Sequence, residues 1–407
     1  MTALPPGQKG KRRGLALAAG GPLGGVYELG ALRALEEAIE GLDLNQCRVY
    51  VGVSAGAFLA SHLANGFTVT EMLRGLLFGD EDENPFDPSI LFMPAYQEWA
   101  RRGAQIPGLL ADALLQASLS PRKQSLFKSL SRLGRALPLG VFDNAPLEAY
   151  LARMFKKKGR TNDFRKLKHR LFVVATDLQD GTAVVFGSED LDHVPISRAV
   201  QASTSLPGLY QPQRIEGKLC VDGVLLKTLH ASVAMEHGAD LVFCVNPIVP
   251  VDVSHEDAQR ILGHDPLIRG GLPSVLSQTL RTLIHSRMVA GMARYRSIFP
   301  DSELLLFRPD RKDYRLFFSN IFSFRSRRQV CEIGYKSTRK DLCRRRDSLG
   351  PTLQAHGLKL RLDVLDDTKR SVWDSIGGLQ TRSTRVTQKL TRTLDDLDMA
   401  LQLVGKD

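Results

Sequence analysis

The stretch Gly52-Val53-Ser54-Ala55-Gly56 places a serine between two glycines, directly after a short run of strand-forming residues. A strand followed by this pattern predicts a strand-to-helix turn so tight that only glycine fits on either side of the serine. Such a turn exposes the Ser54 hydroxyl, and the first N–H groups of the following helix point toward it. The pattern indicates a nucleophile, although a glycine turn carrying a solvated serine has the same spacing.

A serine hydroxyl attacks a carbonyl group only when a nearby base accepts its proton. The chain has nine histidines, but none follows Asp222 in a setting typical of a catalytic base, and His230 and His285 lie in helical surroundings. Asp222 ends an apolar strand and is the economical choice, because burial in an apolar pocket raises the pKa of a carboxyl group toward neutral pH. An ordinary Asp-Gly turn at a strand end is the alternative interpretation.

A second glycine-rich stretch, residues 20–25, follows an apolar strand predicted at 15–19 and precedes a helix predicted at 26–39. A strand, a glycine loop and a helix in this order present main-chain N–H groups to an anion. A Walker-type phosphate loop is excluded because Gly-Lys-Ser/Thr is absent. A dinucleotide fold would need an acid at the end of the second strand, where the sequence has Ser54. The loop therefore fits an oxyanion hole better than a cofactor site.

Four motifs in sequence order resemble those of the patatin-like phospholipase family, a group of lipid acyl hydrolases with a Ser–Asp dyad. They are Gly20-Gly21-Pro22-Leu23-Gly24, Gly52-Val53-Ser54-Ala55-Gly56, Ala202-Ser203-Thr204-Ser205-Leu206-Pro207 and Asp222-Gly223-Val224. Each motif alone is a weak signal, whereas four in the family's order, within residues 14–250, make a specific match. The resemblance says little about residues 310–407.

The resemblance implies a role for each motif. Ser54 would be the nucleophile, held in its elbow by Gly52 and Gly56, and Asp222 would be the base. The oxyanion hole would use main-chain N–H groups from the first motif, at Gly20, Gly21, Leu23 and Gly24, whereas Pro22 has no N–H to donate. The resemblance implies neither a metal ion nor a cofactor, and the sequence lacks both His-Glu-x-x-His and a calcium-loop pattern.

Three positions depart from the family's pattern. Ala19 replaces the first glycine of a common triplet, and Val224 replaces a smaller residue after the Asp-Gly pair. Leu23 stands where many relatives carry an arginine, which puts in question a contact with substrate phosphate from that position.

Apolar strands alternate with helices along most of the chain. Strands are predicted near residues 49–53, 171–176, 219–221, 241–245 and 304–307, with a hairpin after residue 180 and a long helix at 273–299. This alternation predicts an α/β fold, with a mostly parallel central sheet covered by helices on both faces. The family resemblance implies a three-layer patatin-like fold.

We predict three parts: a disordered basic arm (1–13), a catalytic domain (14–310) and a basic, aromatic and helical C-terminal extension (311–407). An insert at about 75–145 contains an amphipathic basic pattern at 122–137, which fits either a lid at a membrane or a cap helix on the core. The aromatics and arginines after residue 310 fit either a lipid anchor or a core-covering helix. Near-heptad spacing from Val372 predicts a partner helix.

The composition is that of a globular protein with excess positive charge. The net charge is +11, which favours an anionic membrane surface as a partner, while the dispersed basic residues and the absence of a recognition motif argue against specific nucleic-acid binding. Five scattered cysteines predict free thiols in a reducing compartment. Because we see neither a membrane-spanning run nor a signal peptide, we expect a cytoplasmic protein or one bound peripherally to a membrane.

These observations predict a serine acyl hydrolase that cleaves carboxylic esters of lipids, with phospholipase A-type activity, through an acyl-enzyme on Ser54. Two alternatives stay open. A neutral-lipid or polyester esterase is favoured if Leu23 means that no phosphate is recognised. A lipid-surface binding or scaffold protein with weak catalysis would use the basic C-terminal part.

Overall fold

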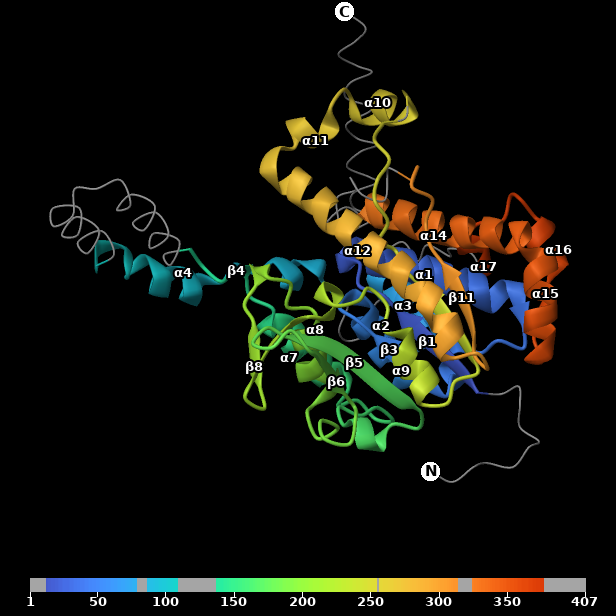
Figure 1. Cartoon of the computed structure of the whole chain (residues 1–407), viewed down its shortest axis with the longest axis horizontal. Helices are drawn as coiled ribbons and strands as arrows, with labels where there is room; N and C mark the ends of the chain where they lie inside the picture. Colours follow the sequence, from blue (N-terminus) through green and yellow to red (C-terminus); the bar gives the residue numbers. More distant parts are fainter. Residues whose placement is uncertain (1–11, 79–85, 109–136, 255, 314–323, 377–407) are drawn as a thin grey trace, which may run out of the picture. The chain divides into compact units, whose positions relative to one another are not determined.

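The computed structural model describes residues 12–78, 86–108, 137–254, 256–313 and 324–376, which fold around a central eight-stranded sheet (Figure 1). Its strands lie in the order β11-β10-β1-β3-β5-β9-β8, and β6 pairs with β5 outside this path. Their bounds are β1 Arg13–Leu17, β3 Val49–Gly52, β5 Arg170–Asp177, β6 Ala183–Phe186, β8 Gln213–Ile215, β9 Lys218–Asp222, β10 Leu241–Val245 and β11 Glu303–Phe307.

Five neighbouring strands, from β11 to β5, run parallel to one another. The other three join by antiparallel pairing: β6 and β9 with β5, and β8 with β9. The α/β fold with a mostly parallel sheet is therefore confirmed. The predicted hairpin is the β5–β6 pair, which turns through Gly181 at a φ of 73°.

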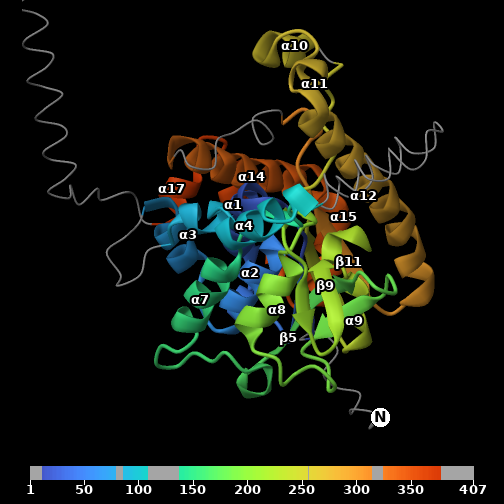
Figure 2. The ribbon, with the colours of Figure 1, turned by 90° about the vertical axis from the view of Figure 1, so that its left-hand side faces the viewer.

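Helices cover both faces of the sheet (Figure 2). One face carries α1 (Gly21–Ala38), α2 (Ala55–Ala64) and α8 (Ile196–Ser203). The other face carries α9 (Ala231–Glu236) and α12 (Gly271–Ile298), which pack on alternate strand residues such as Ala16, Val51, Val174 and Cys244. This alternation is the period-two pattern of strands buried on both faces, and it gives the sheet one core above and one below.

The first helix begins earlier than the sequence predicted. We expected a loop at residues 20–25 and a helix from Val26, but α1 starts at Gly21, so most of the glycine stretch forms its first turns. Gly21 has a φ of 60°, which glycine adopts without strain, and Pro22 follows in the first turn, where its missing N–H costs nothing. The start of α1 is thereby brought close to the end of β1.

The insert expected at about 75–145 is described in part. It contains the end of α3 (Val69–Phe78), the 3-10 turn η2 (Pro88–Phe92), α4 (Tyr96–Gly103), β4 (Gly140–Phe142) and the start of α7 (Ala145–Met154). Strand β4 pairs with β7 (Gly208–Tyr210), which fastens the end of the insert beside the loop after α8. The predicted amphipathic helix at 122–137 lies outside the described residues except for Leu137.

The region after β11 packs on the rest of the fold through α14 (Phe324–Arg344), which contacts α1. Helices α1 and α14 lie side by side in both views (Figures 1 and 2), and residues Met1–Val372 form one compact unit. The remaining described elements here are α15 (Arg346–Ala355), β12 (Lys359–Leu360), α16 (Leu362–Asp366) and α17 (Val372–Ser375), and β12 pairs with β2 (Ile39–Glu40). Most of the predicted basic arm, of the aromatic segment after residue 310 and of the near-heptad segment from Val372 lies outside the described residues.

Two short helices, α10 (Glu256–Leu262) and α11 (Pro266–Arg269), precede α12. Within the described part of the chain, we find no helix with the length and apolar character needed to cross a bilayer.

Candidate active site

Ser54 sits in a strained turn between β3 and α2. Its backbone has a φ of 54° and a ψ of −120°, which side-chain-bearing residues rarely adopt. A Cβ on Gly52 would lie 2.4 Å from the Cα of Ala57, and one on Gly56 would lie 2.4 Å from the carbonyl oxygen of Leu17. Neither position has room for a side chain, so the two glycines permit the turn that the sequence predicted, and the turn presents the hydroxyl of Ser54.

The register of β5 brings Ser54 and Asp222 together. Gly52, the last residue of β3, pairs with Val173, and Asp222, the last residue of β9, pairs with Ala175. The two strand ends are therefore two residues apart along β5. Since β3 runs parallel to β5 and β9 runs antiparallel to it, the residues that end both strands meet at one place, although they lie far apart in the sequence.

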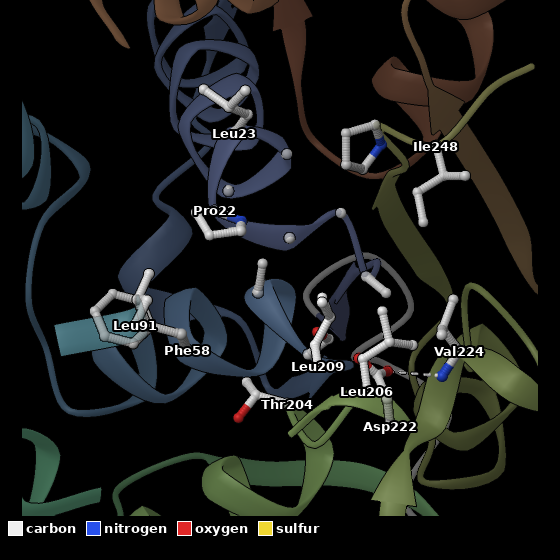
Figure 3. A pocket seen from close by; sticks show the side chains of 18 of the residues that line it. Pro22, Leu23, Phe58, Leu91, Thr204, Leu206, Leu209, Asp222, Val224 and Ile248 are labelled. Atoms are coloured by element: carbon white, nitrogen blue, oxygen red, sulfur yellow. Dashed lines mark hydrogen bonds between the residues drawn. The ribbon is translucent and has the colours of Figure 1, made fainter. Parts of the chain in front are cut away.

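Asp222 is a buried carboxylate with few partners. Its Oδ1 accepts a hydrogen bond from the Val224 N–H at 2.9 Å (Figure 3). Burial raises the pKa of Asp222 to about 7, against the opposing effects of hydrogen bonds from the Val224 N–H and the Ser54 side chain. Desolvation is the largest of these effects, as expected for a carboxyl group in an apolar pocket. A carboxyl group with this pKa can accept a proton near neutral pH.

Neither histidine that we considered as a base lines the cavity above Ser54, although His230 makes a hydrogen bond with the backbone of Gly223, next to Asp222. Burial, with a smaller effect from the Lys227 charge, lowers the pKa of His230 to about 4. The pKa of His285 is also lowered, first by burial and then by the charges of Arg308 and Arg311. No histidine is among the described residues that line the cavity above Ser54.

Residues at the end of α8 and just after it form hydrogen bonds with the backbone of the site. The Oγ of Ser203 accepts a hydrogen bond from the Ser54 N–H at 2.8 Å and donates one to the Val174 carbonyl at 2.6 Å. The N–H of Asp222 donates to the Ser205 carbonyl at 3.0 Å. This short stretch thus holds the backbone of both Ser54 and Asp222, a role that the sequence did not reveal.

The glycine stretch at the start of α1 faces the same cavity. Gly20, Gly21, Leu23 and Gly24 all line it, but the Gly24 N–H donates to the Gly20 carbonyl at 3.1 Å as the first bond of the helix. Gly24 therefore fits the predicted donor set poorly. The N–H groups of Gly21 and Leu23 precede that bond, in the turn where a helix has no internal acceptors for them.

The cavity has a volume of about 440 Å³ and a mostly apolar lining (Figure 3). Phe58 and Leu91 lie on one side of it, and Val224, next to Asp222, lies on the other (Figure 3). The insert contributes Phe86, Pro88, Leu91, Phe92 and Phe142. Among the described residues we find no group of three or more His, Cys, Asp or Glu side chains that could bind a metal ion.

Two of the lining residues that the sequence analysis did not single out are polar or follow the nucleophile directly. Ala55 directly follows Ser54 at the start of α2, and the residue after the nucleophile is a common oxyanion donor, so the elbow motif itself was a signal for it. Arg281, on α12, also lines the cavity. No motif surrounds Arg281 in the sequence, and only the packing of α12 reveals its place.

Comparison with known families agrees with this geometry. The model of the patatin-like phospholipase family matches residues 15–235, more than half of the chain. The chain belongs to this family. The matched segment contains all four motifs and ends within α9, so the patatin-like part includes Ser54, Asp222 and the glycine stretch at the start of α1.

Two curated relatives of this patatin-like chain are themselves uncharacterized. Protein YqhO of Bacillus subtilis is 25% identical over 204 residues, which cover 48% of this chain and 57% of YqhO. Protein R571 of Acanthamoeba polyphaga mimivirus is 23% identical over 203 residues, which cover 49% of this chain and 55% of R571. The match thus spans just over half the length of these relatives.

Two solved structures are similar in part. The crystal structure of VipD from Legionella pneumophila aligns with 82% of this chain and 67% of its own, at 16% identity and a TM-score of 0.37. The type III effector ExoU aligns with 96% of this chain and 62% of its own, at 18% identity and a TM-score of 0.34.

Proposed function

We propose that this protein is a serine acyl hydrolase that cleaves the carboxylic esters of lipids with a Ser54–Asp222 dyad. The observation that carries the proposal is the shared cavity, in which a strained serine and a buried carboxyl group with a pKa of about 7 lie beside the start of α1. Membership of the patatin-like phospholipase family supports hydrolysis of lipids. The acyl position and the dyad itself are parts of the proposal.

In the proposed reaction, the Ser54 Oγ attacks the carbonyl carbon of the ester while its proton passes to Asp222. The negative oxygen of the tetrahedral intermediate accepts hydrogen bonds from loop N–H groups, for which Gly20, Gly21 and Leu23 are the candidates. Collapse of the intermediate expels the alcohol, which takes the proton from Asp222, and leaves an acyl group on Ser54. Asp222 then takes a proton from a water molecule that attacks the acyl carbonyl carbon. When this second tetrahedral intermediate collapses, the bond to the Ser54 Oγ breaks, that oxygen takes the proton back from Asp222, and the fatty acid is released.

The cavity fits a long acyl chain. A volume of about 440 Å³ with a largely aliphatic and aromatic lining suits an apolar ligand with a few polar contacts. The phenylalanines at 58, 86, 92 and 142 line the side formed with the insert. We therefore assign the acyl chain to that side and propose phospholipase A-type activity on one of the acyl esters.

A neutral-lipid esterase is the second candidate, and a specific observation favours it. Leu23 lines the cavity at the position where the family resemblance would place an arginine, and its side chain cannot bind a phosphate group. Rates measured on a phospholipid, a triacylglycerol and a short aryl ester separate the two candidates.

We also propose contact with a lipid surface through the insert. Exposed apolar side chains gather on α4, β4 and β7, at Tyr96, Trp99, Leu139, Val141 and Leu209. The Trp99 Nε1 donates to the Val141 carbonyl at 3.2 Å, and Leu209 also lines the cavity. Exposed aromatic residues at a cavity that takes an acyl chain favour the interface between lipid and water. Trp99→Ser should weaken sedimentation with anionic vesicles without reducing hydrolysis of a soluble ester.

The decisive experiment compares four variants on a soluble ester. We expect Ser54→Ala and Asp222→Asn to lower kcat/KM by about 10³-fold or more, since each removes a group that acts on the reacting atoms. His230→Ala and His285→Ala should keep most of the activity. A His230→Ala variant as inactive as Ser54→Ala, with the fold intact, would replace the proposed dyad by a serine–histidine pair.

A further inference from the structure

Helix α1 buries a glutamate, Glu28, whose side chain reaches the end of β1. Glu28 has no exposed surface, and it is not among the described residues that line the cavity. Its Oε1 accepts a hydrogen bond from the Ala18 N–H at 2.9 Å, and its Oε2 has no hydrogen-bond partner among the described residues. Burial raises the pKa of Glu28 well above its ordinary value, against the opposing effect of the Ala18 N–H. The proposed reaction gives this carboxyl group no role.

The bond between Glu28 and Ala18 closes a loop over the candidate oxyanion donors. Ala18 directly follows β1, Glu28 lies ten residues later in α1, and the candidate donors at 20–23 lie between them. The same Ala18 N–H also donates to the Val245 carbonyl of β10 at 3.1 Å. One N–H therefore joins the end of β1 both to the neighbouring strand and to α1. Because the two ends of the glycine stretch are tied to each other, the path of the chain from β1 into α1 is fixed there.

The carbonyl groups at the end of β1 bind the turn that carries the nucleophile. The Gly56 N–H donates to the Ala18 carbonyl at 3.1 Å, and the Val53 N–H donates to the Leu17 carbonyl at 3.1 Å. Ala18 thus contacts the turn through its carbonyl oxygen and Glu28 through its N–H. A change of the Glu28 side chain could therefore act on the glycine stretch, on the turn, or on both, and an experiment has to separate the two.

A glutamate at this place is unfavourable for stability alone. A polar group taken out of water costs free energy unless it is hydrogen-bonded, and among the described residues only one oxygen of Glu28 has a partner. An apolar side chain of the same length would fill the same space without that cost. The packing of α1 therefore gives no reason for an acid here, whereas the bond to the Ala18 N–H does.

We infer that Glu28 is a positioning residue, which holds the glycine stretch so that its N–H groups meet the oxyanion formed at Ser54. This inference rests on the proposed function and assigns a residue outside the cavity to the same site. Oxyanion donors lower the barrier when they are already at hydrogen-bond distance from the place that the negative oxygen will occupy. The bond to Ala18 needs an acceptor oxygen and no charge, so a neutral amide at position 28 serves the same purpose.

Two substitutions of the same length separate the acceptor oxygen from the rest of the side chain. Glu28→Gln keeps an acceptor for the Ala18 N–H, whereas Glu28→Met fills the space with a thioether, which is a weak acceptor. On a soluble butyrate ester we expect Glu28→Met to lower kcat about tenfold or more with KM nearly unchanged, because the cavity that binds the substrate stays intact. Glu28→Gln should keep most of the wild-type kcat, and an equal loss in both variants would overturn the inference.

The matched control is Glu37→Met, the same change at another buried glutamate of α1. Glu37 accepts hydrogen bonds from Arg370 and Tyr335, and none of these three residues is among those that line the cavity. We expect Glu37→Met to lower the free energy of unfolding without lowering kcat at a temperature where the protein is folded. An equal loss of kcat in Glu37→Met and Glu28→Met would mean that any destabilisation of α1 lowers the rate, and it would overturn the inference.

The second test separates the glycine stretch from the turn at the nucleophile. A thionoester carries sulfur in place of the carbonyl oxygen, and because sulfur is a weaker acceptor, its hydrolysis depends less on the oxyanion donors. We expect Glu28→Met to lower the ratio of kcat/KM for the butyrate ester to kcat/KM for its thionoester about tenfold. Glu28→Gln and Glu37→Met should leave this ratio unchanged. An equal loss on both substrates would assign the effect of Glu28→Met to the turn at Ser54 and would overturn the inference.

The third test measures the glycine stretch without turnover. We expect amide hydrogen exchange in residues 18–24 to be faster in Glu28→Met than in the wild-type chain and unchanged in Glu28→Gln. Unchanged exchange in Glu28→Met would overturn the inference whatever the rates of hydrolysis. If the wild-type chain hydrolyses neither ester while exchange follows the expected pattern, the proposed hydrolase fails and Glu28 still holds the glycine stretch.

Discussion

The main-chain N–H of Ser54 donates a 2.8 Å hydrogen bond to the Oγ of Ser203, which lies at the end of α8. Ser203 is fully buried, and its hydroxyl in turn donates to the Val174 carbonyl of β5. The strained backbone of the nucleophile is therefore tied through one hydroxyl to the strand that also pairs with Asp222. The turn at Ser54 depends on a residue about 150 positions away.

Ser203→Ala tests this dependence. The substitution leaves the buried Ser54 N–H without its acceptor, so we expect a loss of about 1–3 kcal/mol in the free energy of unfolding. The turn at Ser54 should relax, and kcat on a soluble ester should fall about tenfold or more. Both are measured by denaturant titration and initial rates. Ser61→Ala is the control, since this buried hydroxyl donates only to the Phe58 carbonyl within α2. Equal effects of the two substitutions would contradict the assigned role.

The pKa of Asp222 predicts the dependence of the rate on pH. The proposed base works when ionised, and burial raises its pKa to about 7. We expect kcat/KM to rise with pH up to about 7 and to be constant above it, so that at about pH 5 it is roughly a hundredth of the plateau. Release of butyrate from a neutral butyrate ester provides the measurement. An inflection near 4 would point to His230 instead, whose pKa burial lowers to about 4.

Ionisation of Asp222 should also lower the free energy of unfolding. Its folded pKa lies above the ordinary value of 3.8, so the folded state binds the proton more tightly than the unfolded state does. The contribution of Asp222 to the free energy of unfolding is fully present below about pH 4 and is lost as the pH rises through about 7. Asp222→Asn removes the charge, and we expect it to raise the free energy of unfolding at about pH 8, by up to about 4 kcal/mol. At about pH 4 the wild-type and variant unfolding curves should nearly coincide, and a constant difference would contradict the assigned pKa.

Much of the fold follows from local patterns. The strand Leu241–Val245 is a continuous apolar run bounded by polar breaks, and it is predicted to the residue. The turn at Ser54 is also predicted locally. Gly52 and Gly56 lie two residues from Ser54 in the sequence, and the turn has no room for a side chain at either position. The start of α1 is different. Glycine disfavours helix, so propensity predicts a loop at 20–25, whereas the close fit of this stretch to Pro247 belongs to the folded state.

The arrangement of the site depends on pairings that local patterns do not contain. Gly52 and Asp222 pair with residues of β5 that are two positions apart. This proximity depends on the strand register, which is fixed by the whole sheet. The sequence predicted the Ser54–Asp222 pair by another route, from the lack of a suitably placed histidine and from the family resemblance. No sequence motif or family resemblance predicts the position of Arg281. It follows from the hydrogen bonds that join α12 to Val251 and Leu225.

The crossing of α1 and α14 supplies another test. A Cβ on Gly30 would lie 2.0 Å from the Cys331 carbonyl oxygen, and one on Gly334 would lie 2.2 Å from that of Tyr27. We expect Gly30→Ala to destabilise the fold by about 1–3 kcal/mol or more, because backbone cannot move aside as a flexible side chain does. Gly291→Ala is the control, since Gly291 lies inside α12, is not followed by a proline, and a Cβ there meets nothing within 4 Å beyond its chain neighbours; it should stabilise α12 by up to about 1 kcal/mol. Thermal unfolding of the two variants should shift in opposite directions.

The same crossing bears on how a separate role of the C-terminal part could be tested, because a truncation after Arg308 would remove α14. Removal of everything after Arg308 would expose the face of α1 that α14 covers, including the close contact at Gly30. Loss of activity after such a cut would then reflect unfolding. Point substitutions at charged residues on the outer face of α14 keep the packing intact and serve that purpose better.

A buried ionic network on α1 provides the last prediction. The Glu37 carboxylate accepts hydrogen bonds from Arg370 and from the Tyr335 hydroxyl, and Arg339 lies 3.9 Å away. Burial acts to raise the pKa of Glu37, but the hydrogen bonds from Arg370 and Tyr335 outweigh it, so its pKa is lowered. The network therefore stabilises the fold above the ordinary pKa of 4.5, and this contribution is lost as the pH falls through the folded value.

Glu37→Gln removes the charge and leaves two arginines around a neutral amide. We expect the free energy of unfolding to fall by about 3 kcal/mol at neutral pH, as for the loss of one partner of a buried ion pair. The difference from wild type should shrink below about pH 4, where the wild-type carboxylate itself takes up a proton. Glu40→Gln, at an exposed site just after α1, should change stability by less than about 0.5 kcal/mol at any pH. A Glu37→Gln variant as stable as wild type would mean that the hydrogen bonds and ion pairs of Glu37 do not stabilise the fold.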